Sequence, residues 1–103
     1  MSKKILTIAK NLRNYKPKKI ILFGSYVNGK INQDSDVDLL IIKDTKQNPY
    51  ERIPEVRKYL LGSDFAFDIL VMTPQEIKRR LLVDDFFIKD IIQNGKVLYE
   101  AKK

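Results

Sequence analysis

The segment from Val37 to Ile42 is almost continuously apolar, and this feature most constrains the fold. Its sequence is Val-Asp-Leu-Leu-Ile-Ile. A strand with apolar residues on both sides needs cover on both sides, which helices packed on the two faces of a sheet supply. The chain has 103 residues, enough for one such domain but too few for two. We therefore predict a single α/β domain over residues 1–103.

Hydrophobic periodicity and capping signals place the remaining elements. Thr73-Pro74-Gln75-Glu76 predicts a helix start with a capping box, and Pro54 is expected within the first turn of its helix at most. Predicted strands lie at 19–23, 37–42, 65–72 and, at an edge, 96–99. Predicted helices lie at 3–15, 51–61, 74–82 and 84–93, with a turn or one short helix at 25–32 and a polar loop at 44–49.

The composition excludes several kinds of chemistry. The chain has no cysteine and no histidine, so disulfides, thiolate metal sites and Ser-His or Cys-His mechanisms are excluded. Any acid–base or metal chemistry must therefore depend on carboxylates. The longest apolar runs are far shorter than a membrane span, and the first residues have no signal-peptide pattern. We expect a cytoplasmic protein that does not enter a membrane.

The positive charge is unevenly distributed. The formal net charge is +7, and residues 1–33 contain eight lysine or arginine side chains and no acidic one. Such a segment can attract a polyanion or an acidic protein, or it can be a solvated helix face that maintains solubility. Because no aromatic residues are interleaved with the basic ones, we favour the second interpretation and do not expect nucleic-acid binding.

A glycine-marked turn follows the first predicted strand. Gly24 and Gly29 would allow a phosphate to approach the backbone closely, and Ser25 would add a hydroxyl directed at a phosphate or a metal. An ordinary strand-to-helix turn explains a lone Gly-Ser equally well. Asp34 and Ser35, further along, are also typical of plain turns.

Two aspartates are harder to explain by folding alone. Asp36 and Asp38 occupy alternate positions, so both would point to one face, where they would repel by about 4 kcal/mol at roughly 4 Å and an effective dielectric near 20. Asp68 lies within another apolar strand, and the two strands are best reconciled if they adjoin and share a cation. Carboxylates of this kind suit Mg²⁺ or Mn²⁺. Asp64 is a rival third ligand, but it lies nearer the loop, so we prefer Asp68.

These residues resemble a known family. Gly24-Ser25-(x)3-Gly29-(x)6-Asp36-Val37-Asp38-Leu39, followed by Asp68, resembles the DNA polymerase β-like nucleotidyltransferases. The segments 72–77 and 90–99 resemble their minimal (MNT) branch. The resemblance implies a mixed sheet of about four strands (a polymerase β-like palm fold) and transfer of a nucleotidyl group from a nucleoside triphosphate to a hydroxyl, with two metal ions, Mg or Mn. By this resemblance Asp36 and Asp38 would bind both metals, and Asp68 would complete one site and help to deprotonate the acceptor. Nucleotide-binding residues would be Gly24, Ser25 and Gly29, with Lys30 compensating for Val27-Asn28, where many relatives have Ala-Arg.

The same resemblance implies a partner. Minimal nucleotidyltransferases are commonly antitoxins that add AMP from ATP to a tyrosine of a helical HEPN toxin, so a hetero-oligomer with such a toxin is expected. Two alternatives stay open: a module that neutralises its partner by contact alone, and a transferase for a small molecule or an RNA end. The apolar residues between positions 81 and 92 are too many for one helix face, and we favour core burial over an interface for them.

Overall fold

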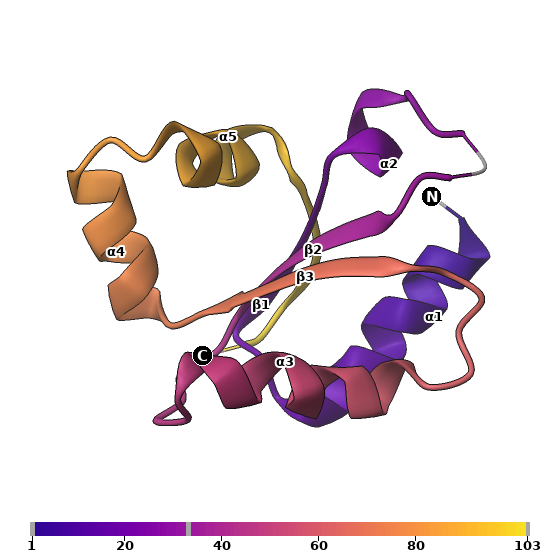
Figure 1. Cartoon of the computed structure of the whole chain (residues 1–103), viewed down its shortest axis with the longest axis horizontal. Coiled ribbons are helices and arrows are strands. Elements are labelled where there is room, and N and C mark those ends of the chain that lie inside the picture. The colour runs from indigo at the N-terminus through magenta and orange to yellow at the C-terminus, as the bar shows by residue number, and fades with distance from the viewer. Residues whose placement is uncertain (1, 33, 103) are drawn as a thin grey trace.

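The computed structural model describes residues 2–32 and 34–102. One sheet contains four strands in the order β3-β2-β1-β4, and Figure 1 shows it between two layers of helices. Strand β2 runs antiparallel to β1 and parallel to β3, and β4 pairs antiparallel with β1 at one edge. The expected α/β fold with a mixed sheet is therefore confirmed. The strands are β1 (Lys19–Phe23), β2 (Val37–Ile42), β3 (Phe67–Met72) and β4 (Lys96–Glu100).

Helices cover both faces of the sheet, as the apolar β2 sequence requires. Helices α1 and α3 lie on one face, and α4 and α5 lie on the other (Figure 1). Short 3-10 turns, η1 and η2, continue α1 and α3, and α2 connects β1 to the loop before β2. The bounds are α1 (Lys3–Leu12), η1 (Arg13–Tyr15), α2 (Ser25–Asn28), α3 (Pro49–Arg57), η2 (Lys58–Leu60), α4 (Pro74–Leu82) and α5 (Phe86–Asn94).

The side chains of β2 divide between two hydrophobic clusters. Val37, Leu39 and Ile41 pack with α1 and α3, whereas Leu40 and Ile42 pack with α4 and α5. The cluster on the α1–α3 face is the larger of the two, and its other buried members are Ile5, Ile8, Leu12, Tyr15, Ile20, Leu22, Val56, Leu60, Ile69 and Val71. The smaller cluster also contains Ile21, Ile77, Ile88 and Ile91.

Side chains cap the starts of helices α1 and α4. The Ser2 hydroxyl accepts a hydrogen bond from Lys4 N at 3.1 Å. Glu76 N donates to Thr73 Oγ1 at 3.1 Å, while Thr73 N donates to Glu76 Oε1 at 2.8 Å, which confirms the capping box. These bonds pair backbone N–H groups that the helix itself leaves unpaired.

The third helix differs from the prediction. Asn48 Oδ1 accepts a hydrogen bond from Tyr50 N at 2.8 Å and Pro49 takes the first helical position, so α3 begins before Glu51. Pro54 consequently lies inside the helix rather than in its first turn. It is exposed, so the carbonyl that would have accepted its missing N–H can bond to water. Strand β3 and helix α5 also begin two residues later than predicted, at Phe67 and Phe86.

An ion pair joins α3 to α4. Arg52 Nη1 contacts Glu76 Oε1 at 2.6 Å, and the Arg52 side chain is only 7% exposed. The guanidinium also donates to the carbonyl oxygens of Gln47 at 3.0 Å and Val71 at 3.3 Å. The pair therefore connects the two helical layers beside β3, and the hydrogen bonds satisfy the charge of the buried arginine.

The preference for core burial of the apolar residues between 81 and 92 was correct only in part. Ile88 and Ile91 are buried on the sheet. The others are exposed, because α4 and α5 each turn one apolar stripe to the sheet and the rest of their surface faces outward. The exposed residues of this group are Leu81, Leu82, Val83, Phe86, Phe87 and Ile92. Among the described residues, no helix combines the length and apolar character needed to cross a bilayer.

Candidate active site

Two of the predicted carboxylates lie side by side in the sheet. Asp38 on β2 is the register partner of Asp68 on the parallel strand β3. Both residues have the same strand parity as the side chains that pack against α4 and α5, so both point to that face of the sheet. Asp36 precedes β2 by one residue and is exposed. The expectation that the two aspartate-bearing strands adjoin is confirmed.

The electrostatics of Asp38 fit a site that gathers negative charge. Partial burial raises the pKa of Asp38 above its ordinary value of 3.8, and the negative charges of Asp68 and then Asp36 raise it further. Two neighbouring carboxylates therefore act on Asp38. A divalent cation among them would reverse this unfavourable interaction.

Gly24 shapes the turn against Asp38. Its φ is +74°, a conformation that residues with a Cβ rarely adopt. A Cβ built there would lie 2.1 Å from Asp38 Oδ2, so only glycine leaves space for the carboxylate beside the turn. The Gly24 carbonyl accepts hydrogen bonds from Val27 N at 3.0 Å and Asn28 N at 3.1 Å, which begins α2. The Gly24 turn and the Asp38 carboxylate therefore pack directly against each other.

Gly29 ends the short helix and begins the loop to β2. Its φ is +80°, and Gly29 N donates to the Ser25 carbonyl at 3.2 Å. Asn28 Oδ1 accepts a hydrogen bond from Lys30 N at 3.3 Å, and Lys30 is exposed. Asp34 N donates to Asn32 Oδ1 at 2.8 Å, which agrees with the plain turn role considered for Asp34.

The carboxylates of Asp36, Asp38 and Asp68 are of the kind that binds a divalent cation, but their oxygens do not lie close to one point. Carboxylate oxygens are the ligands that Mg²⁺ prefers. Among residues 2–32 and 34–102, no group of three acidic side chains is close enough together to hold a metal ion. Asp38 and Asp68 already share a face and a register position, so side-chain rotation alone could bring their oxygens onto one ion.

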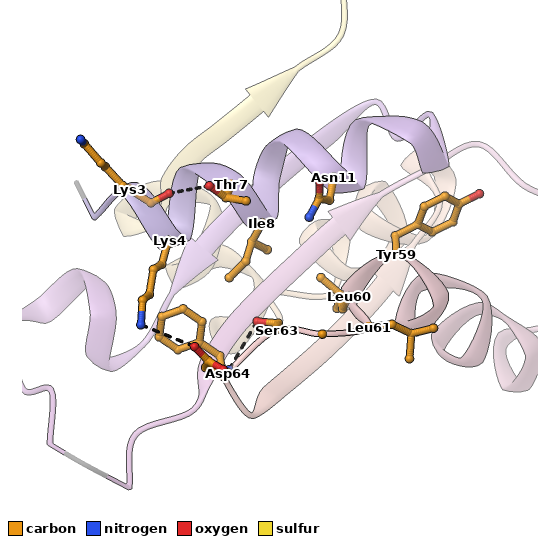
Figure 2. Close-up of a pocket in the computed structure, with 12 residues that line it drawn as sticks. Lys3, Lys4, Thr7, Ile8, Asn11, Tyr59, Leu60, Leu61, Ser63 and Asp64 are labelled. Atoms are coloured by element: carbon orange, nitrogen blue, oxygen red, sulfur yellow. Dashed lines mark hydrogen bonds and ion pairs between the residues drawn. The ribbon is translucent and has the colours of Figure 1, made fainter.

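The rival ligand Asp64 lies elsewhere. It precedes β3 and forms an exposed ion pair with Lys4 of α1, Nζ to Oδ2 3.6 Å. Figure 2 shows both side chains at the rim of a cavity between α1 and the segment that follows η2. This cavity, of about 290 Å³, is lined by residues of the α1–α3 face, including Ile8 and Leu60. The placement supports our preference for Asp68.

Helix α5 closes the other side of the turn. A hollow of about 190 Å³ is lined by Phe23, Gly24, Val27 and Asn28 and, from α5 and the residue after it, by Asp90, Ile91, Asn94 and Gly95. Asn94 Nδ2 donates to Asp90 Oδ1 at 2.6 Å across one turn of the helix. Our sequence analysis did not assign Asp90 and Asn94 to the site. No local signal marks them, because only the tertiary fold brings α5 beside Gly24.

Comparison with known proteins identifies the family. The family described as Polymerase beta, Nucleotidyltransferase matches residues 3–103. The chain belongs to this family and is a nucleotidyltransferase. It is also 30% identical over 83 residues to "Putative protein adenylyltransferase MJ0604" of Methanocaldococcus jannaschii, an alignment that covers 80% of this chain and 78% of the relative. The family expected from the sequence motif is confirmed.

Two solved structures have the same fold. A chain from the crystal structure of a toxin-antitoxin with AMP-PNP aligns over 98% of this chain and 76% of its own length, with a TM-score of 0.69 and 22% identity. A crystal structure described as a putative nucleotidyltransferase from Sulfolobus solfataricus aligns over 75% of this chain and 70% of its own, with a TM-score of 0.58 and 22% identity. At this level of identity the likeness concerns the fold.

Proposed function

We propose that this chain is an antitoxin that transfers AMP from ATP to a tyrosine hydroxyl of a cognate HEPN toxin. The observation that carries the proposal is the in-register pair of Asp38 and Asp68 beside the Gly24 turn. Membership of the nucleotidyltransferase family supports the reaction type. The relative named as a protein adenylyltransferase and the toxin-antitoxin structure with AMP-PNP support the acceptor class and the nucleotide.

In the proposed reaction the acceptor oxygen attacks the α-phosphorus of ATP. A new P–O bond forms there, the bond from the α-phosphorus to the bridging oxygen breaks, and pyrophosphate leaves. Asp68 helps to remove the proton of the attacking hydroxyl. When bound by Asp36, Asp38 and Asp68, two Mg²⁺ ions would neutralise charge on the phosphates and lower the pKa of the acceptor hydroxyl.

The glycine turn holds the leaving group in this proposal. Gly24, Ser25 and Gly29 would contact the β- and γ-phosphates through backbone N–H groups and the Ser25 hydroxyl. Lys30, exposed one residue after Gly29, supplies a positive charge toward the same phosphates. The hollow beside Gly24 offers room for part of the nucleotide.

One observation favours a second candidate, a contact antitoxin without transferase activity. Asn28 occupies a position where many relatives have arginine, and its side chain bonds to Lys30 N at the end of α2. Position 28 therefore supplies no positive charge to the turn. The same fold could neutralise a partner by binding alone.

Intact mass spectrometry of the partner distinguishes the two functions. The toxin, incubated with this chain, ATP and Mg²⁺, should gain the mass of one or more AMP groups. Asp38→Asn should bind the toxin and leave its mass unchanged. A toxin that binds the wild-type chain and is never modified would refute the transferase proposal and leave the contact antitoxin.

A further inference from the structure

Five large apolar side chains form an exposed patch where α4 ends and α5 begins. Their exposed fractions are 39% for Leu81, 74% for Leu82, 71% for Val83, 78% for Phe86 and 55% for Phe87. Single exposed apolar residues are normal, but a contiguous group of this kind indicates a binding surface. We call these five residues the α4–α5 patch.

The α4–α5 patch is continuous with the catalytic face. The ring of Phe87 contacts the ring of Phe23 edge to face, with centroids 5.8 Å apart, and Phe23 is the register partner of Asp38. Asp90 lines both the hollow beside Gly24 and a second hollow of about 420 Å³ next to Phe86. A partner that covers the patch therefore lies beside the carboxylates.

Charge selects the kind of partner. The chain has a formal net charge of +7, so two copies would repel each other, whereas an acidic protein would be attracted. Next to the patch on α4, Lys78, Arg79 and Arg80 are exposed, against one exposed carboxylate, Asp84, in the connection to α5. The α4 rim is therefore basic and can pair with carboxylates of a partner. An apolar centre with a charged rim is the usual anatomy of a protein interface.

We propose that the α4–α5 patch docks an acidic protein that presents the acceptor hydroxyl to Asp38 and Asp68. The proposal rests on the proposed function, because that function supplies a protein acceptor. The patch would bind the body of the partner, while the acceptor residue reaches the carboxylates from the same side of the sheet. Selectivity for the acceptor would then come from the docking surface rather than from contacts at the reacting hydroxyl.

The test uses two variants with matched changes. Leu82→Gln/Phe86→Gln removes two apolar side chains from the patch, and Tyr50→Gln/Leu61→Gln removes two that are 90% and 83% exposed on the α1–α3 side of the molecule. Neither variant changes the net charge, and all four positions are exposed, so both should fold. The probe is the purified product of the reading frame adjacent to this chain's own. Binding is measured by titration calorimetry. Light scattering measures the mass of each protein in solution and so shows whether it is a monomer or a dimer.

The patch variant should bind the probe at least about 100-fold more weakly, as expected when central apolar anchors are lost, and the control variant should bind within about threefold of wild type. Equal binding by the patch variant would overturn the proposal, as would a wild-type chain that does not bind the probe. A wild-type dimer that dissociates in the patch variant would assign the patch to self-association instead. If the probe binds through the patch but is never modified, the docking proposal stands and the transferase proposal fails.

Discussion

The α1–α3 face of the sheet holds the larger hydrophobic cluster, whereas the helices on the α4–α5 face leave a group of neighbouring large apolar side chains exposed. Ile5 and Leu12 on α1 are 1% and 0% exposed, but Leu82 and Phe86 are 74% and 78% exposed. The candidate-site carboxylates Asp38 and Asp68 lie on the α4–α5 face. The comparison teaches that one face of the sheet mainly stabilises the fold, while the other combines a smaller core with the site.

The largest expected effect contrasts the same substitution on the two faces. Leu12→Ala should lower the free energy of unfolding by about 2–5 kcal/mol, because it removes a fully buried side chain and leaves a cavity. Leu82→Ala should change it by less than about 0.5 kcal/mol. Urea denaturation of both variants measures the difference, and similar losses would mean that the two faces contribute equally to stability.

The next effect concerns activity at the candidate site. Gly24→Ala places a Cβ against Asp38 Oδ2, and a displacement of about 1 Å at a catalytic group can cost about 100-fold in rate. Gly29→Ala is the matched control, since Gly29 has a similar positive φ but nothing within 4 Å of its built Cβ. Gly24→Ala should also lose more stability than Gly29→Ala, because its Cβ meets Asp38 and its backbone (φ +74°, ψ −145°) lies outside the left-handed region that Gly29 occupies. In the folded proteins, only Gly24→Ala should nearly abolish AMP transfer. Equal activities would show that the contact with Asp38 is unimportant.

A smaller effect is expected at the link between the two helical layers. Glu76→Gln keeps an acceptor for Arg52 and Thr73 N but removes the charge, so we expect a loss of about 1–2 kcal/mol in the free energy of unfolding. Glu55→Gln is the control. Glu55 pairs with Lys58, whose side chain is 69% exposed, so this pair should contribute little to stability. A loss for Glu55→Gln as large as that for Glu76→Gln would contradict the view that burial strengthens the Arg52 pair.

The smallest effect is a difference in pH dependence between two carboxyl groups. The hydrogen bond from Arg52 is the main cause that lowers the pKa of Glu76 below its ordinary value of 4.5. The stability that Glu76 contributes is therefore present above pH 4.5 and is lost as the pH falls through its lower folded value. Burial raises the pKa of Asp38 above 3.8, so its ionisation costs stability at neutral pH and that cost disappears on acidification.

Unfolding measured between pH 7 and pH 3 in the presence of a chelator tests both signs. The loss of stability on acidification should be shallower in Glu76→Gln than in wild type, because the variant has no carboxylate to protonate at that position. It should be steeper in Asp38→Asn, which lacks the compensating gain. The same slope in all three proteins would show that neither carboxyl group is perturbed by folding.

Local patterns were enough to predict much of this fold and part of the site. Asp38 and Asp68 stood out because a carboxylate within an apolar strand needs a reason, and the structure confirms that the two strands adjoin. The Thr73–Glu76 capping box was also readable, because its bonds join residues three positions apart. The capping box lies within one segment, and the aspartate pair joins two strands that are both apolar.

The remaining features depend on contacts that no segment encodes alone. The apolar residues at the end of α4 and the start of α5 have the same composition whether they face a core or a partner, so our preference for the core was wrong for Leu82 and Phe86. We predicted Pro54 in the first turn of its helix at most. Asn48 and Pro49 begin that helix before Glu51, so Pro54 lies in its interior. The approach of α5 to Gly24 depends on packing between distant parts of the chain.

The parallel pairing of β2 with β3 has a consequence for when the site is completed during folding. Asp36 and Asp38 take their places with the antiparallel β1–β2 pair, which is close in sequence. Asp68 reaches its position only when β3 pairs in parallel with β2. Contacts between segments so far apart in the sequence form slowly. We therefore expect refolding chains to regain β-sheet signal before they regain transferase activity. Under the proposed function, a chain could react only after β3 has joined the sheet and placed Asp68 beside Asp38.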